Sequence, residues 1–245
     1  EGFASKHLSK IPKINQLEKN SALTLLTVFR NFSEKNIGNT LPEYLVSFCI
    51  SYLIGSIPTA YLVVKKTSKM DIRTVGSGNV GGRNALEVTG KKTVGVIVVA
   101  IDVLKGILTV ILATVLFPEN VLTVGAAMVG SVTGHCYPVW LKFKGGRGLA
   151  TAAGVFLVTC WIWVGVWLLL YFIALKAVKH VHAATVIALI VTPLTMLFVS
   201  KEIFVRMIPD YFLPNQFIIA GGLPMFVCLT RHIEPLKELY EEKNH

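Results

Sequence analysis

The chain has 245 residues, of which 53% are hydrophobic and only 16% are charged, yet its formal net charge is +10. Its mean hydropathy of +0.62 lies far above that of soluble domains, in which apolar and charged residues are more evenly matched. The same composition excludes intrinsic disorder, which requires low hydrophobicity. The apolar residues also form blocks too long for the core of a soluble domain, so we expect an integral membrane protein.

The first forty residues form a separate region, because they are polar and basic up to Lys19 and then carry a short amphipathic stretch around Leu23–Phe29. Such a stretch suits the membrane surface. We therefore expect a basic amphipathic N-terminal extension over residues 1–40 and a transmembrane domain over residues 41–245. The chain starts at Glu1 without a methionine, for which processing of a targeting segment and a tag remnant are both explanations.

Six apolar segments follow, and a membrane-spanning helix needs roughly 20 mostly apolar residues. One of them is apolar over 27 positions, enough for one tilted helix or for two short helices folded as a hairpin. The last has only 14 positions, so it crosses a thin region or starts further upstream. The pattern predicts an all-α polytopic membrane helix bundle of about seven transmembrane helices. The segments are Tyr44–Val64, Val94–Leu116, Val121–Leu141, Leu149–Leu175, Val181–Val199 and Phe217–Thr230.

Two short loops hold +8 of the net charge. Seven basic residues against two acidic ones lie in Lys65–Lys92, and three basic residues lie in Lys142–Arg147. If the first three segments span the membrane, both loops lie on one face and Pro118–Asn120, which has no basic residue, lies on the other. The positive-inside rule makes the basic face cytoplasmic or its organellar equivalent. We favour the hairpin over Leu149–Leu175, which returns Arg231 to that face, whereas a single span would place it opposite.

The first basic loop combines glycines with arginines. Gly76, Gly78 and Gly81 match the pattern G-x-G-x-x-G, but the match is weak because the chain has no strand–helix–strand unit around it. Glycines nevertheless allow successive backbone N–H groups to turn inward as a nest for an anion. Arg73 and Arg83 could add charge-assisted hydrogen bonds to phosphate oxygens. The alternative is a flexible turn whose cations follow only the orientation rule.

The second basic loop again alternates cations with glycines, directly before a helix expected to begin near Leu149. A helix N-terminus offers unpaired N–H groups and the positive end of the helix dipole, both of which suit phosphate. Two phosphate-binding loops on one face are more informative than either alone. The candidate phosphate-binding residues of this loop are Lys142, Lys144, Gly145, Gly146 and Arg147.

Charged residues inside apolar spans are costly, which makes them functional candidates. Asp102 and Lys105 share one face of the second span, with Asp102 about 14 Å from the basic face. His135 lies about 9 Å from the same face, so all three can line a cavity that opens toward the basic loops. The alternative is a structural Asp–Lys pair with a helix-packing histidine. We expect His180 and His182 to be interfacial residues.

Four motifs, in this order and spacing, resemble the PlsY acyl-phosphate:glycerol-3-phosphate acyltransferases. The resemblance covers roughly Leu41 to the C-terminus. It implies about seven helices with the motifs on the cytoplasmic face, and transfer of a fatty acyl group from acyl-phosphate to glycerol 3-phosphate. Lysophosphatidate and phosphate would be the products, with no metal or organic cofactor. The motifs are Tyr52–Pro58, Arg73–Gly81, Asp102–Gly106 and Gly134–Thr151.

The resemblance also implies the site residues. His135 is a candidate base or hydrogen-bond donor, although the phosphate of the acyl donor could accept the proton instead. The residues implied to line the site are Ser56, Arg73, Ser77, Asn79 and Lys105, with Ser56, Lys105 and His135 as catalytic candidates. The supporting positions are Asp102, Asn84, Thr151, Arg231 and His232.

The chain departs from the family pattern at several of these motifs. Arg83 stands where the family has threonine, Arg147 replaces lysine, His182 replaces a serine, and Pro235 replaces an asparagine. These changes motivate a second hypothesis, a catalytically degenerate accessory subunit of a larger membrane complex. An organic-anion transporter is a third, against which stands the lack of inverted repeats. Acyl-phosphate, glycerol 3-phosphate and membrane lipid are the expected partners, without nucleic acid, in a bacterial or organellar inner membrane.

Overall fold

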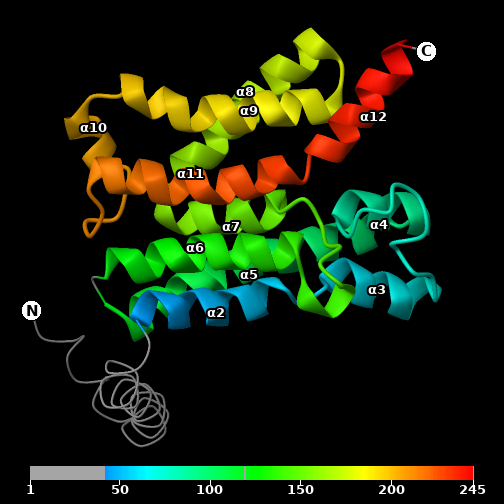
Figure 1. The fold of residues 1–245 in the computed structure, drawn as a ribbon, viewed down its shortest axis with the longest axis horizontal. Helices are drawn as coiled ribbons and strands as arrows, with labels where there is room; N and C mark the ends of the chain where they lie inside the picture. The colour runs from blue at the N-terminus through cyan, green and yellow to red at the C-terminus, as the bar shows by residue number, and fades with distance from the viewer. Residues whose placement is uncertain (1–41, 119, 245) are drawn as a thin grey trace, which may run out of the picture. The chain divides into compact units, whose positions relative to one another are not determined.

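The computed structural model describes residues 42–118 and 120–244, and all regular elements in those residues are helical, which confirms the all-α fold. The expected amphipathic extension over residues 1–40 lies outside the described residues. The elements are α2 (Glu43–Gly55), α3 (Thr59–Ser68), α4 (Gly82–Thr89), α5 (Lys92–Leu116), α6 (Val121–Cys136), η2 (Val139–Leu141), α7 (Leu149–Thr159), α8 (Trp161–Val178), α9 (Val181–Thr195), η3 (Met196–Phe198), α10 (Lys201–Val205), α11 (Pro214–Thr230) and α12 (Ile233–Asn244) (Figure 1).

Three segments are each long and apolar enough to cross a membrane, namely Glu43–Ser68, Lys92–Leu116 and Trp161–Val178. Helix α11 passes the same test together with the first part of α12, to which it is bent by 42°. Helices α7 and α9 are apolar but shorter. An integral membrane bundle is therefore confirmed, while the number of about seven spans stays a prediction.

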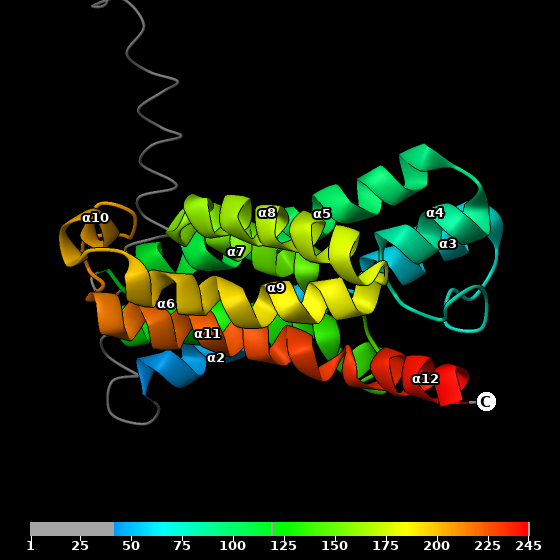
Figure 2. The same ribbon diagram turned by 90° about the horizontal axis from the view of Figure 1, so that it is seen from above.

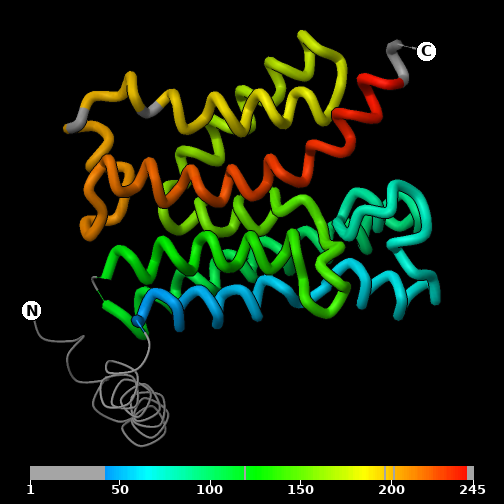
Figure 3. Tube along the Cα trace, viewed as in Figure 1, coloured from blue at the N-terminus to red at the C-terminus, as the bar shows by residue number. Residues whose placement is uncertain are grey.

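The long apolar segment after the second basic loop forms two helices, as the hairpin prediction required. Only Cys160 separates α7 from α8, and its N–H closes α7 on Phe156 O while its carbonyl accepts from Trp163 N. The chain reverses there, so α8 runs back toward the end at which α7 began (Figure 3). Helices α3, α4 and α12 lie at that same end, and α10 lies at the opposite one (Figure 2). Arg231 accordingly reaches the second basic loop, donating from Nη2 to Gly145 O at 3.1 Å.

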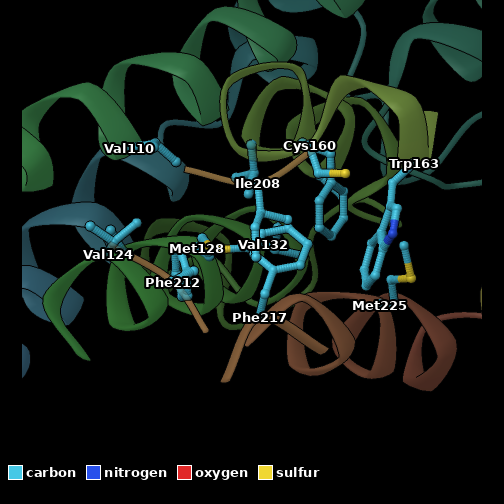
Figure 4. Close-up of a cluster of buried hydrophobic side chains, with 14 of the residues drawn as sticks. Val110, Val124, Met128, Val132, Cys160, Trp163, Ile208, Phe212, Phe217 and Met225 are labelled. Atoms are coloured by element: carbon cyan, nitrogen blue, oxygen red, sulfur yellow. The ribbon is translucent and has the colours of Figure 1, made fainter. Parts of the chain in front are cut away.

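The main apolar core joins α5, α6, α7, α8, α9 and α11, with α10 and the turn after it (Figure 4). Trp163 is fully buried and packs edge-on against Phe217, with ring centroids 5.2 Å apart. Gly221 makes room for that indole, because a Cβ there would lie 2.7 Å from Trp163 Cζ3. This core holds the second half of the bundle against α6 and so supports the floor of the site described below.

Close backbone contacts position α5 and α7 relative to one another. Gly106 and Gly154 both lie where an added Cβ would collide with the facing backbone, at the carbonyls of Thr151 and Val103. Small residues allow this approach, and membrane helices depend on it because lipid supplies no hydrophobic driving force for helix association. Asp102 and Lys105 are consequently held beside the first turn of α7.

Candidate active site

The first basic loop folds around the buried side chain of Asn84, which lies in the first turn of α4. Asn84 Nδ2 donates to the carbonyls of Ile72, Val75 and Asn79 at 3.0–3.2 Å, and its Oδ1 accepts from Ser77 N at 3.1 Å. The amide therefore serves as a template for the loop, and its supporting role in the site stays a prediction.

The expected anion nest over Gly76, Ser77 and Gly78 does not form in this arrangement. Ser77 N donates to the Asn84 amide and Gly78 N donates to Val75 O, so neither N–H is free for an anion. The positive φ angles of Gly76 (58°) and Gly78 (66°) serve the turn itself. Only the end of the loop, from Asn79 onward, faces the cavity described below.

Arg73 is engaged within its own loop. Its guanidinium makes a bidentate pair with Asp71, with Nε–Oδ1 at 2.9 Å and Nη2–Oδ2 at 2.6 Å, and lies over the ring of Tyr61. The hydrogen bond from Arg73 lowers the pKa of Asp71 from 3.8 to about 2. The structure thus places Arg73 in a surface ion pair rather than among the residues that line the cavity.

The second basic loop separates its glycines from its lysines. Gly145 and Gly146 are buried and donate to the carbonyls of Cys136 and His135, whereas Lys142 and Lys144 are exposed. A Cβ at Gly146 would collide with His135 Nε2, so this glycine leaves the imidazole edge open.

Asp102, Lys105 and His135 meet inside the bundle, and each is at most 9% exposed. Lys105 Nζ lies 2.8 Å from Asp102 Oδ1, and His135 Nδ1 lies 3.6 Å from the same oxygen. Nζ also donates to the carbonyls of Gly55 and Ile57, which the break between α2 and α3 leaves without helical partners. Lys105 therefore clamps that break in the structure, while its catalytic role stays a prediction.

Ser56 lies in the same helix break and is fully buried. Its hydroxyl donates to Leu53 O at 2.8 Å and accepts from Trp140 Nε1 at 2.9 Å. The break itself follows from Pro58, which lacks the N–H that would continue α2. The structure does not place Ser56 among the cavity-lining residues.

A cavity of about 350 Å³ is lined by several of the other candidates. The end of the first loop and the start of α4 form one wall, and the start of α7 forms another, so two helix N-termini open into the same space. The buried pair of Asp102 and His135 lies between them. The lining residues from the loops are Asn79, Gly81, Gly82, Arg83, Arg147, Gly148, Leu149 and Ala150.

Arg147 is the cavity-lining cation without a side-chain partner in the described part of the chain. Arg83 is paired with Glu87 at 2.9 Å, and Arg231 donates to two loop carbonyls. Burial lowers the pKa of Arg147, and repulsion from Arg231 and Arg83 lowers it further. An anion bound beside Arg147 would offset both effects.

Two histidines complete the wall opposite these loops. His232 Nδ1 lies 2.9 Å from Cys228 O, which places the proton on Nδ1 and leaves Nε2 as an acceptor. His182, expected at the interface, lines the cavity with its ring 5.5 Å from that of His232. Its Nδ1 is buried without a hydrogen-bond partner among the described residues.

The cavity also contains residues that the sequence did not single out as a site. Trp167 and Tyr171 stack at 5.3 Å on α8, and Thr185 lies on α9. Thr151, a supporting candidate, is fully buried and does not line the cavity, and its Oγ1 has no hydrogen-bond partner in the described part of the chain. Within the described residues no group of three side chains is arranged to hold a metal ion.

The fold and the cavity define an integral membrane protein with a site suited to anions. A sequence model of the family "Glycerol-3-phosphate acyltransferase" matches residues 45–242, and the chain belongs to this family. The glycerol-3-phosphate acyltransferase of Endomicrobium trichonymphae is 42% identical over 199 residues, which cover 80% of this chain and 92% of the relative. That of Prochlorococcus marinus is 38% identical over 189 residues, covering 77% and 86%.

The fold is also similar to that of a solved relative. The crystal structure of PlsY (YgiH), an integral membrane glycerol 3-phosphate acyltransferase, in its glycerol 3-phosphate form matches with a TM-score of 0.67 at 28% identity. The match covers 83% of this chain and 95% of that chain. These findings favour an acyltransferase over the accessory-subunit alternative.

Proposed function

We propose that the cavity transfers a fatty acyl group from an acyl-phosphate to glycerol 3-phosphate. The glycerol hydroxyl oxygen would attack the acyl carbonyl carbon, forming the ester bond of lysophosphatidate, while the bond to the phosphate oxygen breaks and inorganic phosphate leaves. The acceptor is supported by the names of the relatives, and one of the similar structures is of PlsY in its lysophosphatidic acid form. The donor rests on the resemblance between the motifs of this chain and those of the PlsY family.

The main physical task of this reaction is to hold two mutually repelling phosphates side by side. Two helix N-termini, at Gly82 and Leu149, offer N–H groups and positive dipole ends on facing walls. Arg147 lies between them as a charged donor for which the described residues provide no side-chain partner. Orienting both substrates in this way is itself a large source of rate enhancement.

The reaction also releases a proton from the attacking hydroxyl. His135, beside Asp102, and the departing phosphate are the two acceptors considered for this proton, and their contributions separate experimentally. If His135 is the base, His135→Gln should abolish the rise of kcat/KM on the acid side of the pH profile; if phosphate is the acceptor, that limb should persist. Preorganised N–H donors would stabilise the oxyanion of the tetrahedral intermediate in either case.

The basic loops and the cavity mouth would lie on the cytoplasmic face of a bacterial membrane or on the equivalent face of an organellar inner membrane. The excess of lysine and arginine in Lys65–Lys92 and Lys142–Arg147 supports this orientation. Cysteine labelling at Lys91→Cys and Glu234→Cys in sealed vesicles should modify both positions from the same side.

The observation that carries the proposal is that Arg147, unpaired among residues 42–118 and 120–244, lies between two helix N-termini in one cavity. The reconstituted chain, given acyl-phosphate and labelled glycerol 3-phosphate, should form lysophosphatidate and phosphate in equal amounts. Arg147→Gln should lower kcat/KM by about 10- to 100-fold, the loss of a charge-assisted hydrogen bond. Arg83→Gln, a matched control whose arginine already pairs with Glu87, should change it less than threefold. Absence of product from folded protein, or equal effects of the two variants, would contradict the assignment.

A further inference from the structure

Two lysines of the second basic loop remain unexplained by the cavity. Lys142 and Lys144 are exposed, do not line the space that Arg147 enters, and form no ion pair within residues 42–118 and 120–244. Arg73 and Arg83, at the same end of the bundle, each hold an acidic partner. The two lysines are therefore free to bind an anion from outside the protein.

The backbone around these lysines has a fixed and unusual shape. Lys142 and Phe143 both have left-handed conformations, with φ angles of 53° and 62°, which non-glycine residues rarely adopt. Hydrogen bonds from Phe143 N to Pro138 O and from Lys144 N to Leu141 O hold the turn. Such strained conformations persist where the surrounding structure enforces them, and they concentrate at functional positions.

This turn, residues 139–144, is hereafter the interfacial loop. Leu141 is only 4% exposed and anchors the loop in the core between α3, α4 and α5. The aromatic side chains on either side point the other way, with Trp140 62% and Phe143 57% exposed. The orientation of the Trp140 side chain is fixed, because its indole N–H donates a hydrogen bond to Ser56 Oγ. The loop thus presents two aromatic rings and two lysines together from a rigid base.

This combination matches the chemistry of a lipid headgroup layer. Tryptophan and phenylalanine beside a membrane boundary favour the interface, and lysines near the cytoplasmic leaflet are attracted to anionic lipid. We propose that the interfacial loop binds anionic phospholipids, with Lys142 and Lys144 on the headgroup phosphates and Trp140 and Phe143 inserted among the adjoining lipids. This binding is independent of acyl transfer.

Fluorescence quenching by brominated lipid tests the proposal on the full chain in bilayer nanodiscs. The signal lost in Trp140→Phe isolates Trp140 from the other three tryptophans. Brominated phosphatidylglycerol should quench that signal at a much lower mole fraction than brominated phosphatidylcholine. Lys142→Gln with Lys144→Gln should weaken the preference for the anionic lipid by about 30-fold, since each lysine contributes roughly fivefold. Lys91→Gln with Lys92→Gln removes equal charge from exposed positions at the same end and should leave the preference within about threefold.

Equal quenching of the wild-type protein by the two lipids would overturn the proposal, as would equal losses in the two double variants. Retained quenching by brominated phosphatidylcholine in Lys142→Gln with Lys144→Gln would show that the altered loop still reaches the lipid. Because the measurement uses neither acyl-phosphate nor glycerol 3-phosphate, its failure leaves the proposed reaction intact, and an inactive enzyme leaves this binding intact.

Discussion

Substitution of Gly146 by alanine gives the sharpest test of the site geometry. The added Cβ would lie 2.6 Å from Val80 O and closer still to His135 Nε2, where ordinary contact begins near 3.4 Å. Both the carbonyl and the imidazole must therefore move away from the new Cβ by about 1 Å, and misplacement of that size costs on the order of 100-fold in rate. We expect kcat/KM to fall by about that factor, which corresponds to about 2.7 kcal/mol of transition-state stabilisation.

The assay is the initial rate of lysophosphatidate formation in nanodiscs, measured beside the thermal unfolding midpoint of each protein. Gly165→Ala is the matched control, because no heavy atom lies within 4 Å of the position its Cβ would take on α8. This control should keep full activity, and alanine there favours the helix by up to about 1 kcal/mol. If Gly146→Ala retained more than half of the wild-type rate with an unchanged unfolding midpoint, the placement of His135 in the reacting geometry would be refuted.

Three further predictions concern the supports of the site. Asn84→Ala removes the amide that makes hydrogen bonds to four backbone groups of the loop, so the free energy of unfolding should fall by about 2 to 4 kcal/mol. Proteases should then cut the first basic loop, and unchanged protease resistance would contradict the template role. Lys105→Met leaves the Asp102 carboxylate buried without its ammonium partner and should lower the free energy of unfolding by about 3 to 5 kcal/mol. Combining it with Asp102→Leu should recover part of that loss in thermal unfolding, and strictly additive losses would argue against the pair. Because the pKa of Asp71 is depressed from 3.8 to about 2, its ion pair with Arg73 stabilises the fold above pH 4, and this contribution disappears as the pH falls through about 2. The acid unfolding curves of the wild type and of Asp71→Asn should therefore converge below pH 2.

The arrangement of the helices follows largely from the sequence. The apolar stretch over Leu149–Leu175 was ambiguous by length alone, but the positive loops favoured a hairpin, and the hydrogen bonds from Arg231 to Gly145 and Gly146 confirm it. The short last segment begins at Pro214, upstream of its apolar boundary, because proline suits the first turn of a helix. Charge and apolar length are local properties, so a single sequence reveals them.

The details of the loops could not be derived in this way. The pattern of Gly76 and Gly78 is compatible with an anion nest, yet their loop closes on Asn84, whose bonds depend on the final fold. Similarly, Lys142 and Arg147 belong to one run of cations, but only Arg147 turns into the cavity. A run of like charges does not reveal which side chains its backbone will expose.

The far wall of the cavity could be predicted only in part, for a different reason. Trp167, His182 and His232 lie on α8, on α9 and after α11, and they meet only because these elements pack together. In the sequence, Trp167 is indistinguishable from the packing aromatics beside it. The two histidines did carry a signal: the family resemblance named His232 as a supporting position, and His182 departs from the family pattern at a motif position.

The glycine contacts between α5 and α7 also bear on how a lipid-sized substrate reaches the cavity. At Gly106 and Gly154 the backbones of α5 and α7 are in direct contact, and no side chain there could rotate aside. A substrate therefore cannot pass between these two helices. Helix α8 differs, since Trp163 and Ala174 are its buried residues and Gly165 faces open space. The acyl donor is therefore expected to enter the cavity from the bilayer on the side of α8. Cross-linking α8 to α9 should slow the entry of the acyl donor and leave that of the water-soluble acceptor unchanged.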